Sequence, residues 1–282
     1  GVPSPTGAIT ATGAGSLLDA GGDRISVGSL GTGTLTISAG AKATAGNTLY
    51  ATPAAEAGFS LGSLGGTGTA TVIGAGSTLT VNGSLTDGGT STTAGGTGTL
   101  TVASGGVASF TSAFLYAGGT LQAGTDGLIQ IGAGPSTGLS GIAITAGGML
   151  LANGGTIKGS VTGAGALQLG AGTLDVSGTV GGQALSFTTV GATLKVRGLQ
   201  GATTATGFQA GDAIDLVGVT GATLSTASGS TVLTAGTGSI TFGALPASTG
   251  LQLISDGAGG SILLVPNAVA TVGAVVSQVV PS

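Results

Sequence analysis

The heptapeptide GTGTLTI at residues 31–37 recurs almost unchanged at residues 66–72 (GTGTATV) and 96–102 (GTGTLTV). Side chains alternate within each copy: Leu35 and Ile37 share one face of an extended strand, and the threonines between them share the other. Alternating, β-branched segments of this kind are typical of a strand with one buried face. The repetition predicts that such strands stack on one another.

A looser unit, Thr followed by Leu or Ala, any residue and an apolar residue, recurs along most of the chain, and its copies begin at residues 34, 48, 69, 78, 99, 120, 173 and 193. The intervals 48–69, 78–99 and 99–120 are equal, and the interval 173–193 is shorter by a single position. We interpret this period of about 20 residues as one turn of a solenoid, with insertions or several strands per turn where the interval differs. At the usual strand spacing of ~4.8 Å, about 12 to 13 turns would extend over roughly 60 Å.

The composition supports an ordered, narrow all-β fold. Gly accounts for 62 of 282 residues, charged residues for 5 % and aromatic residues for 3 %, whereas 41 % of the residues are hydrophobic. Disordered chains usually have the opposite balance of charge and hydropathy, and collagen needs Gly at every third position. The sequence therefore predicts a single elongated β-solenoid with extended terminal strands and Gly-rich corners. Its predicted core includes Leu35, Ile37, Val72, Leu79, Val81, Leu100 and Val102.

Changes in the repeat pattern and in residue composition divide the chain into four parts. Residues 1–20 form an irregular lead-in, and residues 21–200 carry the solenoid repeats. Residues 201–266 contain longer alternating stretches, which we interpret as a terminal β module that caps the solenoid. Residues 267–282 form an apolar tail bounded by prolines.

Catalytic and metal-binding residue types are scarce. The chain has no His or Cys, and Glu56 is its only Glu. Asp212 and Asp215 are three residues apart, which places them on opposite faces of a strand, so we interpret them as turn-capping residues rather than an acid–base pair. Asp-Gly at residues 126–127 and 256–257 is typical of turns. We expect no enzymatic activity, no catalytic or metal site and no cofactor; a β-helical carbohydrate-active enzyme is a remote alternative.

The charge pattern also argues against nucleic acid, because the net charge is −4 and only five residues are cationic. No apolar stretch is long enough for a membrane span. Paired outward threonines such as Thr34 and Thr36 raise ice binding as a second remote alternative. The series ends after Thr101, so we interpret these threonines as strand-forming ladders.

The repeats at residues 28–51 and 62–85 resemble the Gly-Thr-Leu-Thr-Val repeats of autotransporter passenger domains and other secreted bacterial surface proteins. The stretch FQAGDAIDLVGVTGATL at 208–224 resembles a module near the ends of large proteobacterial surface proteins. The resemblance implies a right-handed parallel β-helix located outside the cell, at the surface of a Gram-negative bacterium. It also implies a role as an adhesin or a matrix component.

Solenoid ends suggest how such a protein would act. An open end exposes unpaired backbone groups and apolar core, and the sequence shows no charged cap at either end. We expect head-to-tail assembly of identical copies by strand exchange or end stacking, giving a surface filament or biofilm matrix. The candidate interface residues are Ile9, Val272, Val275, Val276, Val279 and Val280. The alternative is a monomeric adhesin passenger that binds surface glycans or host ligands.

Overall fold

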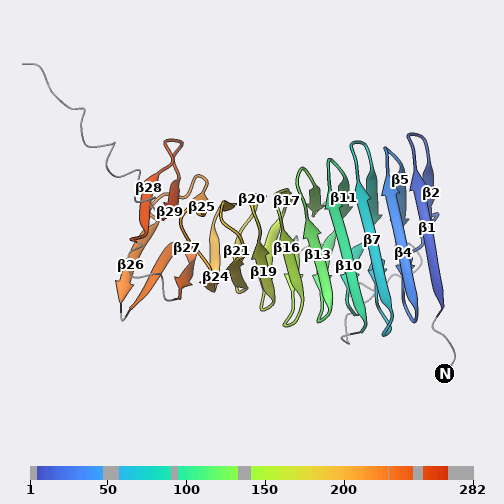
Figure 1. The fold of residues 1–282 in the computed structure, drawn as a ribbon, viewed down its shortest axis with the longest axis horizontal. Helices are drawn as coiled ribbons and strands as arrows, with labels where there is room; N and C mark the ends of the chain where they lie inside the picture. Colours follow the sequence, from blue (N-terminus) through green and yellow to red (C-terminus); the bar gives the residue numbers. More distant parts are fainter. Residues whose placement is uncertain are drawn as a thin grey trace, which may run out of the picture.

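The computed structural model describes residues 5–46, 57–89, 95–132, 141–227, 229–243 and 250–265. These residues form 29 strands and contain no helix. Most of the strands are arranged as a parallel stack along the long axis of the molecule (Figure 1). The predicted all-β, elongated solenoid is therefore confirmed. No helix in the described ranges is long and apolar enough to cross a membrane.

Each turn of the solenoid contributes three strands, one to each of three faces that we name A, B and C. Face A contains β1 (Thr6–Thr12), β4 (Thr32–Ser38), β7 (Thr67–Ile73), β10 (Thr97–Ala103), β13 (Gly119–Ala123), β16 (Met149–Ala152), β19 (Ala166–Leu169) and β22 (Ala184–Phe187). Face B contains β2 (Leu17–Asp19), β5 (Lys42–Gly46), β8 (Thr78–Asn82), β11 (Val107–Phe110), β14 (Leu128–Ile131), β17 (Thr156–Lys158), β20 (Gly172–Val176), β23 (Ala192–Val196) and β25 (Ala213–Leu216). Face C contains β3 (Ile25–Val27), β6 (Ala57–Leu61), β9 (Ser84–Asp87), β12 (Ser112–Leu115), β15 (Gly141–Ile144), β18 (Ser160–Gly163) and β21 (Val180–Gly181).

Like positions stack in ladders because consecutive turns pair in parallel register. On face A, Leu35 pairs with Ala70, which pairs with Leu100, and all three side chains are buried. Within each strand, the residues that alternate with these inward side chains point outward. As a result, β4, β7 and β10 each present three threonines in matching register. The three copies of the heptapeptide therefore form the face A strands of three successive turns.

The turns differ in length more than a constant period predicts. Paired residues on face A are 35 apart from Thr32 to Thr67, but only 17 apart from Met149 to Ala166. The interval 99–120 is a true turn, since Thr99 pairs with Thr120, and so is 173–193. The interval 78–99 is not, because Thr78 lies on face B and Thr99 on face A.

Part of the sequence lies in loops between the strands, so the chain completes fewer turns than the 12 to 13 predicted from a period of about 20 residues. Among the described residues, strands β1 to β21 make seven complete three-strand turns, and β22, β23 and the start of β24 make an eighth. The stack also begins earlier than residue 21. β1 and β2, inside the predicted lead-in 1–20, pair with β4 and β5 and form the first turn.

The C-terminal end departs from the three-strand pattern. The long strands β24 (Leu199–Thr206) and β27 (Ser230–Phe242) bridge faces C and A, since β24 pairs with both β21 and β22. Antiparallel strands are then added: β26 (Thr223–Ala227) pairs with β27, and β29 (Ser261–Leu264) pairs with β25 and with β28 (Gln252–Ser255). These elements all fall in the predicted module 201–266, apart from the start of β24.

Aromatic side chains fill the core at this C-terminal end. The ring of Phe208 lies 4.8 Å from that of Phe187 and 5.3 Å from that of Phe242, measured between ring centroids. All three side chains are buried. Aromatic rings in such edge-on and tilted contacts pack favourably, so this end of the core is closed by side chains of its own chain.

Candidate assembly surface at the N-terminal end

The first turn, β1 to β3, has strand partners on one side only. Among the described residues, β1 pairs with β4, β2 with β5 and β3 with β6, and none has a second neighbour. Their other edges therefore present backbone N–H and C=O groups that a further strand could pair with. The open turn lies at the end of the stack where Figure 1 marks the N-terminus.

Large apolar side chains are exposed at this turn. Ile9 occupies an inward position and stacks on Leu35, yet it is 53 % exposed whereas Leu35 is 2 % exposed. The difference arises because Leu35 has a turn on both sides and Ile9 on one. Leu17 and Leu30, also in the first turn, are 60 % and 70 % exposed. Three of the six exposed large hydrophobic side chains in the described residues thus belong to residues 5–31.

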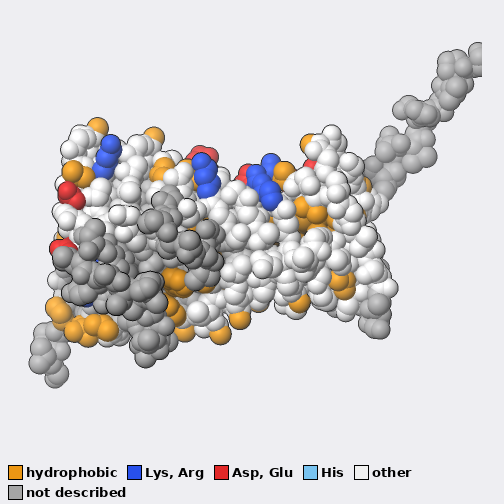
Figure 2. All heavy atoms as spheres, turned by 180° about the vertical axis from the view of Figure 1, so that it is seen from behind, with side chains coloured by type: hydrophobic (Ala, Val, Ile, Leu, Met, Phe, Trp, Pro, Cys, Tyr) orange, Lys and Arg blue, Asp and Glu red, His pale blue; other side chains and the backbone are white. Residues whose placement is uncertain are grey.

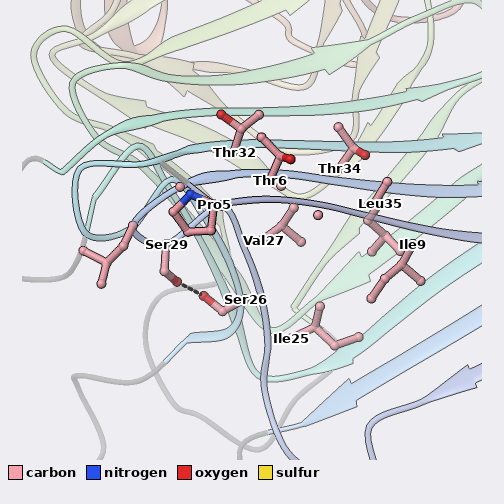
Figure 3. A pocket seen from close by; sticks show the side chains of 16 residues that line it. Pro5, Thr6, Ile9, Ile25, Ser26, Val27, Ser29, Thr32, Thr34 and Leu35 are labelled. Atoms are coloured by element: carbon pink, nitrogen blue, oxygen red, sulfur yellow. Dashed lines mark hydrogen bonds between the residues drawn. The ribbon is translucent and has the colours of Figure 1, made fainter. Parts of the chain in front are cut away.

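An open groove of about 460 Å³ lies between β1 and the corner that joins β3 to β4. In Figure 3 the side chains of Ile9, Ile25, Val27 and Leu35 lie near one another at one part of this groove, and the lining threonines lie together at another. Its lining runs from Pro5 to Ile9 and from residue 25 to 35, and it includes no charged residue. The groove therefore suits an uncharged, apolar ligand segment.

Hydroxyl groups and a glycine hold the corner beside the groove. Ser26 Oγ lies 2.5 Å from Ser29 Oγ and 2.7 Å from Ser60 Oγ, and Ser29 Oγ lies 3.2 Å from Ser63 Oγ. Gly28 has a φ of 66°, and a Cβ there would overlap the Thr67 carbonyl. The corner is thus tied to the next turn, which positions the groove on a rigid support.

Charged side chains gather elsewhere, on face B. Parallel pairing places Lys195 between Asp175 and Asp215, and the Arg197 guanidinium also contacts the Asp175 carboxylate. Figure 2 shows most of the visible charged side chains along one edge of the molecule, away from its lower side. Opposite charges stacked on successive turns attract, so this ladder avoids the repulsion that stacked like charges would produce.

Asp212 is a turn-capping residue. It is 1 % exposed, and its carboxylate accepts hydrogen bonds of 3.0 Å from the backbone amides of Gly191, Ala192 and Gln209. Asp215 lies in β25 beside Lys195, so the two carboxylates are not brought together as a pair. The described part of the chain contains no group of three or more His, Cys, Asp or Glu side chains that could hold a metal ion.

The Asp residues of the two predicted Asp-Gly turns differ: Asp126 has a positive φ, whereas the Asp256 side chain accepts hydrogen bonds from nearby backbone amides. Asp126 has a positive φ of 56°. Asp256 accepts hydrogen bonds from the amides of Ala258 and Gly260, and these bonds lower the pKa of its carboxyl group. Asp19 likewise has a lowered pKa, chiefly because the Thr44 hydroxyl donates to it.

The other sequence-predicted residues divide into two groups. Each of the predicted core residues is at most 4 % exposed: Leu35, Ile37, Val72, Leu79, Val81, Leu100 and Val102. Ile9 lies at the groove of the first turn. The predicted C-terminal anchors lie outside the described residues: Val272, Val275, Val276, Val279 and Val280.

Sequence reasoning missed two features. The groove residues Ile25 and Val27 lie in a three-residue strand, which is too short for its alternation to be recognised. Asp87 ends β9 at an inward core position and is fully buried. The alternation of Leu85 and Asp87 in SLTD would have placed both side chains on the same face.

No protein-family model matches this chain, and no curated protein was found to be similar to it.

Proposed function

We propose that this protein is a structural subunit that assembles head to tail into a filament or matrix on the outside of a Gram-negative bacterium. The observation that carries the proposal is the open first turn, where an uncharged apolar groove lies beside strand edges that are unpaired among the described residues. Solenoid proteins usually cover such ends, because an open end templates further strands. A contact between unlike ends does not close on itself and therefore gives a filament.

The extracellular location rests on the resemblance of the 28–51 and 62–85 repeats to passenger domains. The partner in this proposal is another copy of the chain. It involves no catalysis, cofactor, nucleic acid or membrane span. The contrast between the two solenoid ends supports it further, since the other end is covered by antiparallel strands and a cluster of aromatic rings.

Negative-stain electron microscopy over a concentration series tests the proposal. We expect thin filaments whose axial repeat is about 38–43 Å, the length of a stack of eight to nine turns. Ile9→Asp places a charge in the apolar groove and should leave isolated rods. The matched control is Val190→Asp, because Val190 is 60 % exposed but lies outside the first turn, and it should leave the filaments intact.

Isolated rods of the unsubstituted protein at every concentration would contradict assembly. They would favour the alternative, a monomeric adhesin passenger that binds host or glycan ligands through its outer faces. The in-register threonines of β4, β7 and β10 are the first surface to substitute in that case.

A further inference from the structure

The acceptor for a further strand is defined most closely on face A. β1 has three inward positions, occupied by Gly7, Ile9 and Ala11, and β4 repeats their small-then-large order with Gly33 and Leu35. At Gly33 an added Cβ would overlap the backbone of Gly28, which explains why the first inward position is small. An added Cβ at Gly7 in β1 itself meets nothing, so the requirement that β1 sets for a further strand on face A is a large apolar residue over Ile9.

The C-terminal sequence of the chain contains one such stretch. Residues 266–282 carry no charged residue and six valines, which matches a groove without charged lining. Ala270, Val272 and Ala274 alternate as small, large and small, with residues 271 and 273 between them. Whether this stretch runs parallel or antiparallel to β1, the central Val272 comes to lie opposite the central Ile9.

We propose that residues 269–275 of one copy add as a seven-residue strand to the free edge of β1 in the next copy, with Val272 packed on Ile9. This inference rests on the proposed head-to-tail assembly and names its donor, its acceptor and their register. The seven residues match the length of β1, Thr6–Thr12. Backbone hydrogen bonds would supply the β-augmentation, and the groove would select the apolar face of the donor.

The donor must come from another copy, because a chain cannot reach its own groove. On face B the order from β2 to β29 contains nine strand-to-strand steps, which at ~4.8 Å each amount to about 43 Å. The last described strand ends at Leu264, so five residues separate it from residue 270. The six residue steps from Leu264 to residue 270 span at most about 22 Å when fully extended. Strand addition by this segment is therefore intermolecular and leads to head-to-tail growth.

Cysteine crosslinking tests the register, since the natural chain contains no cysteine. Two single variants, Ile9→Cys and Val272→Cys, are mixed and mildly oxidised, so that any disulfide between them joins two copies. Neighbouring strands lie ~4.8 Å apart, which is within the Cα–Cα range of disulfides. The matched control mixes Ile9→Cys with Val275→Cys, because in the proposed strand residue 275 would face outward, three residues away from residue 272. We expect mixed disulfide dimers from the first pair only.

A second measurement uses the concentration at which filaments first form. Val272→Asp should raise this concentration by at least about tenfold, because it removes a buried valine and puts a charge against the apolar groove. Val280→Asp, outside the donor strand, should leave it unchanged. Both substitutions lie outside the described strands of the solenoid, so circular dichroism should show the same β content in both variants.

The outcomes separate this inference from the proposed function. Filaments without an Ile9–Val272 crosslink, or with equal effects of the two Asp variants, would overturn the donor assignment and leave head-to-tail assembly standing. Isolated rods with no crosslink at any concentration would overturn both.

Discussion

Asp87 offers the sharpest test of how this core is built. Its side chain occupies an inward position in the face C ladder between Leu61 and Leu115, and it is fully buried. Neither carboxyl oxygen has a hydrogen-bond partner of good geometry. Burial raises the pKa of this carboxyl group well above its usual value, and the backbone amide of Thr120 offsets only part of the effect. We therefore expect Asp87 to be neutral in the folded protein.

The sign of its effect on stability follows from that raised pKa. Below the unfolded-state pKa both states are protonated, and Asp87 adds no pH dependence. Above it the unfolded chain loses a proton that the folded chain retains, so the free energy of unfolding falls as the pH rises. The fall is about 1.4 kcal/mol per pH unit, or at most about 4 kcal/mol between pH 4 and pH 7. The free energy of unfolding stops falling once the pH exceeds the pKa of Asp87 in the folded state.

Two substitutions separate ionisation from packing. Asp87→Asn keeps the size of the side chain but cannot ionise, so it should remove this pH dependence. Asp87→Leu should also remove it and, by completing the ladder between Leu61 and Leu115, stabilise the fold by a further ~1.5–3 kcal/mol. Gly98 leaves space beside Asp87, since a Cβ there would overlap the carboxyl group.

Urea denaturation followed by circular dichroism at a series of pH values measures these effects. The quantity of interest is the difference between the unsubstituted protein and Asp87→Asn, because the other carboxyl groups contribute equally to both. Asp19→Asn is a control of opposite sign: hydrogen bonds lower the pKa of Asp19, so its stabilisation is present at neutral pH and lost as the pH falls. Parallel pH profiles for the unsubstituted protein and Asp87→Asn would refute the reasoning.

Three further predictions concern corners and the C-terminal end, and each is measured by urea denaturation. Gly62→Ala should destabilise the fold by more than about 2 kcal/mol, because Gly62 has a φ of 59° and a Cβ would overlap a backbone carbonyl; Gly65→Ala, with a φ of 93° and open space, should cost about half of that or less. Equal losses would mean that crowding at the corner is unimportant. Asp212→Ala leaves three backbone amides without their acceptor and should cost about 3 kcal/mol or more; a loss below about 1 kcal/mol would show that other groups satisfy them. Phe208→Ala should cost about 3–5 kcal/mol, and a negligible loss would rule out the aromatic cluster as the closure of the core.

Much of the strand architecture could be predicted from local pattern. The alternation in GTGTLTI places Leu35 and Ile37 inside, and their burial needs no more than one apolar face per strand. The candidate assembly surface could not be predicted in the same way. Ile9 has the same alternation as Leu35, and nothing local distinguishes them. Their exposure differs because only one of them has strands on both sides, which depends on the whole stack.

Turn length also lay beyond the sequence pattern. Thr78 and Thr99 begin similar units at the same spacing as Thr99 and Thr120, yet only the second pair shares a face. A strand unit looks alike wherever it occurs, because alternation reports which side is buried and not which neighbour pairs with it. Neighbours are selected by the corners and loops between the strands, and these vary from turn to turn.

The sequence by itself determined that the chain forms short, one-sided strands with small corner residues, and hence a narrow apolar interior. Only the tertiary structure decided which strands share a face, how many turns the chain completes, and that the first turn has an open edge. It also decided that Asp87 is enclosed between two leucines. The physical reason is that side-chain alternation is a property of one strand, whereas pairing, burial and exposure are properties of the strands that lie beside it.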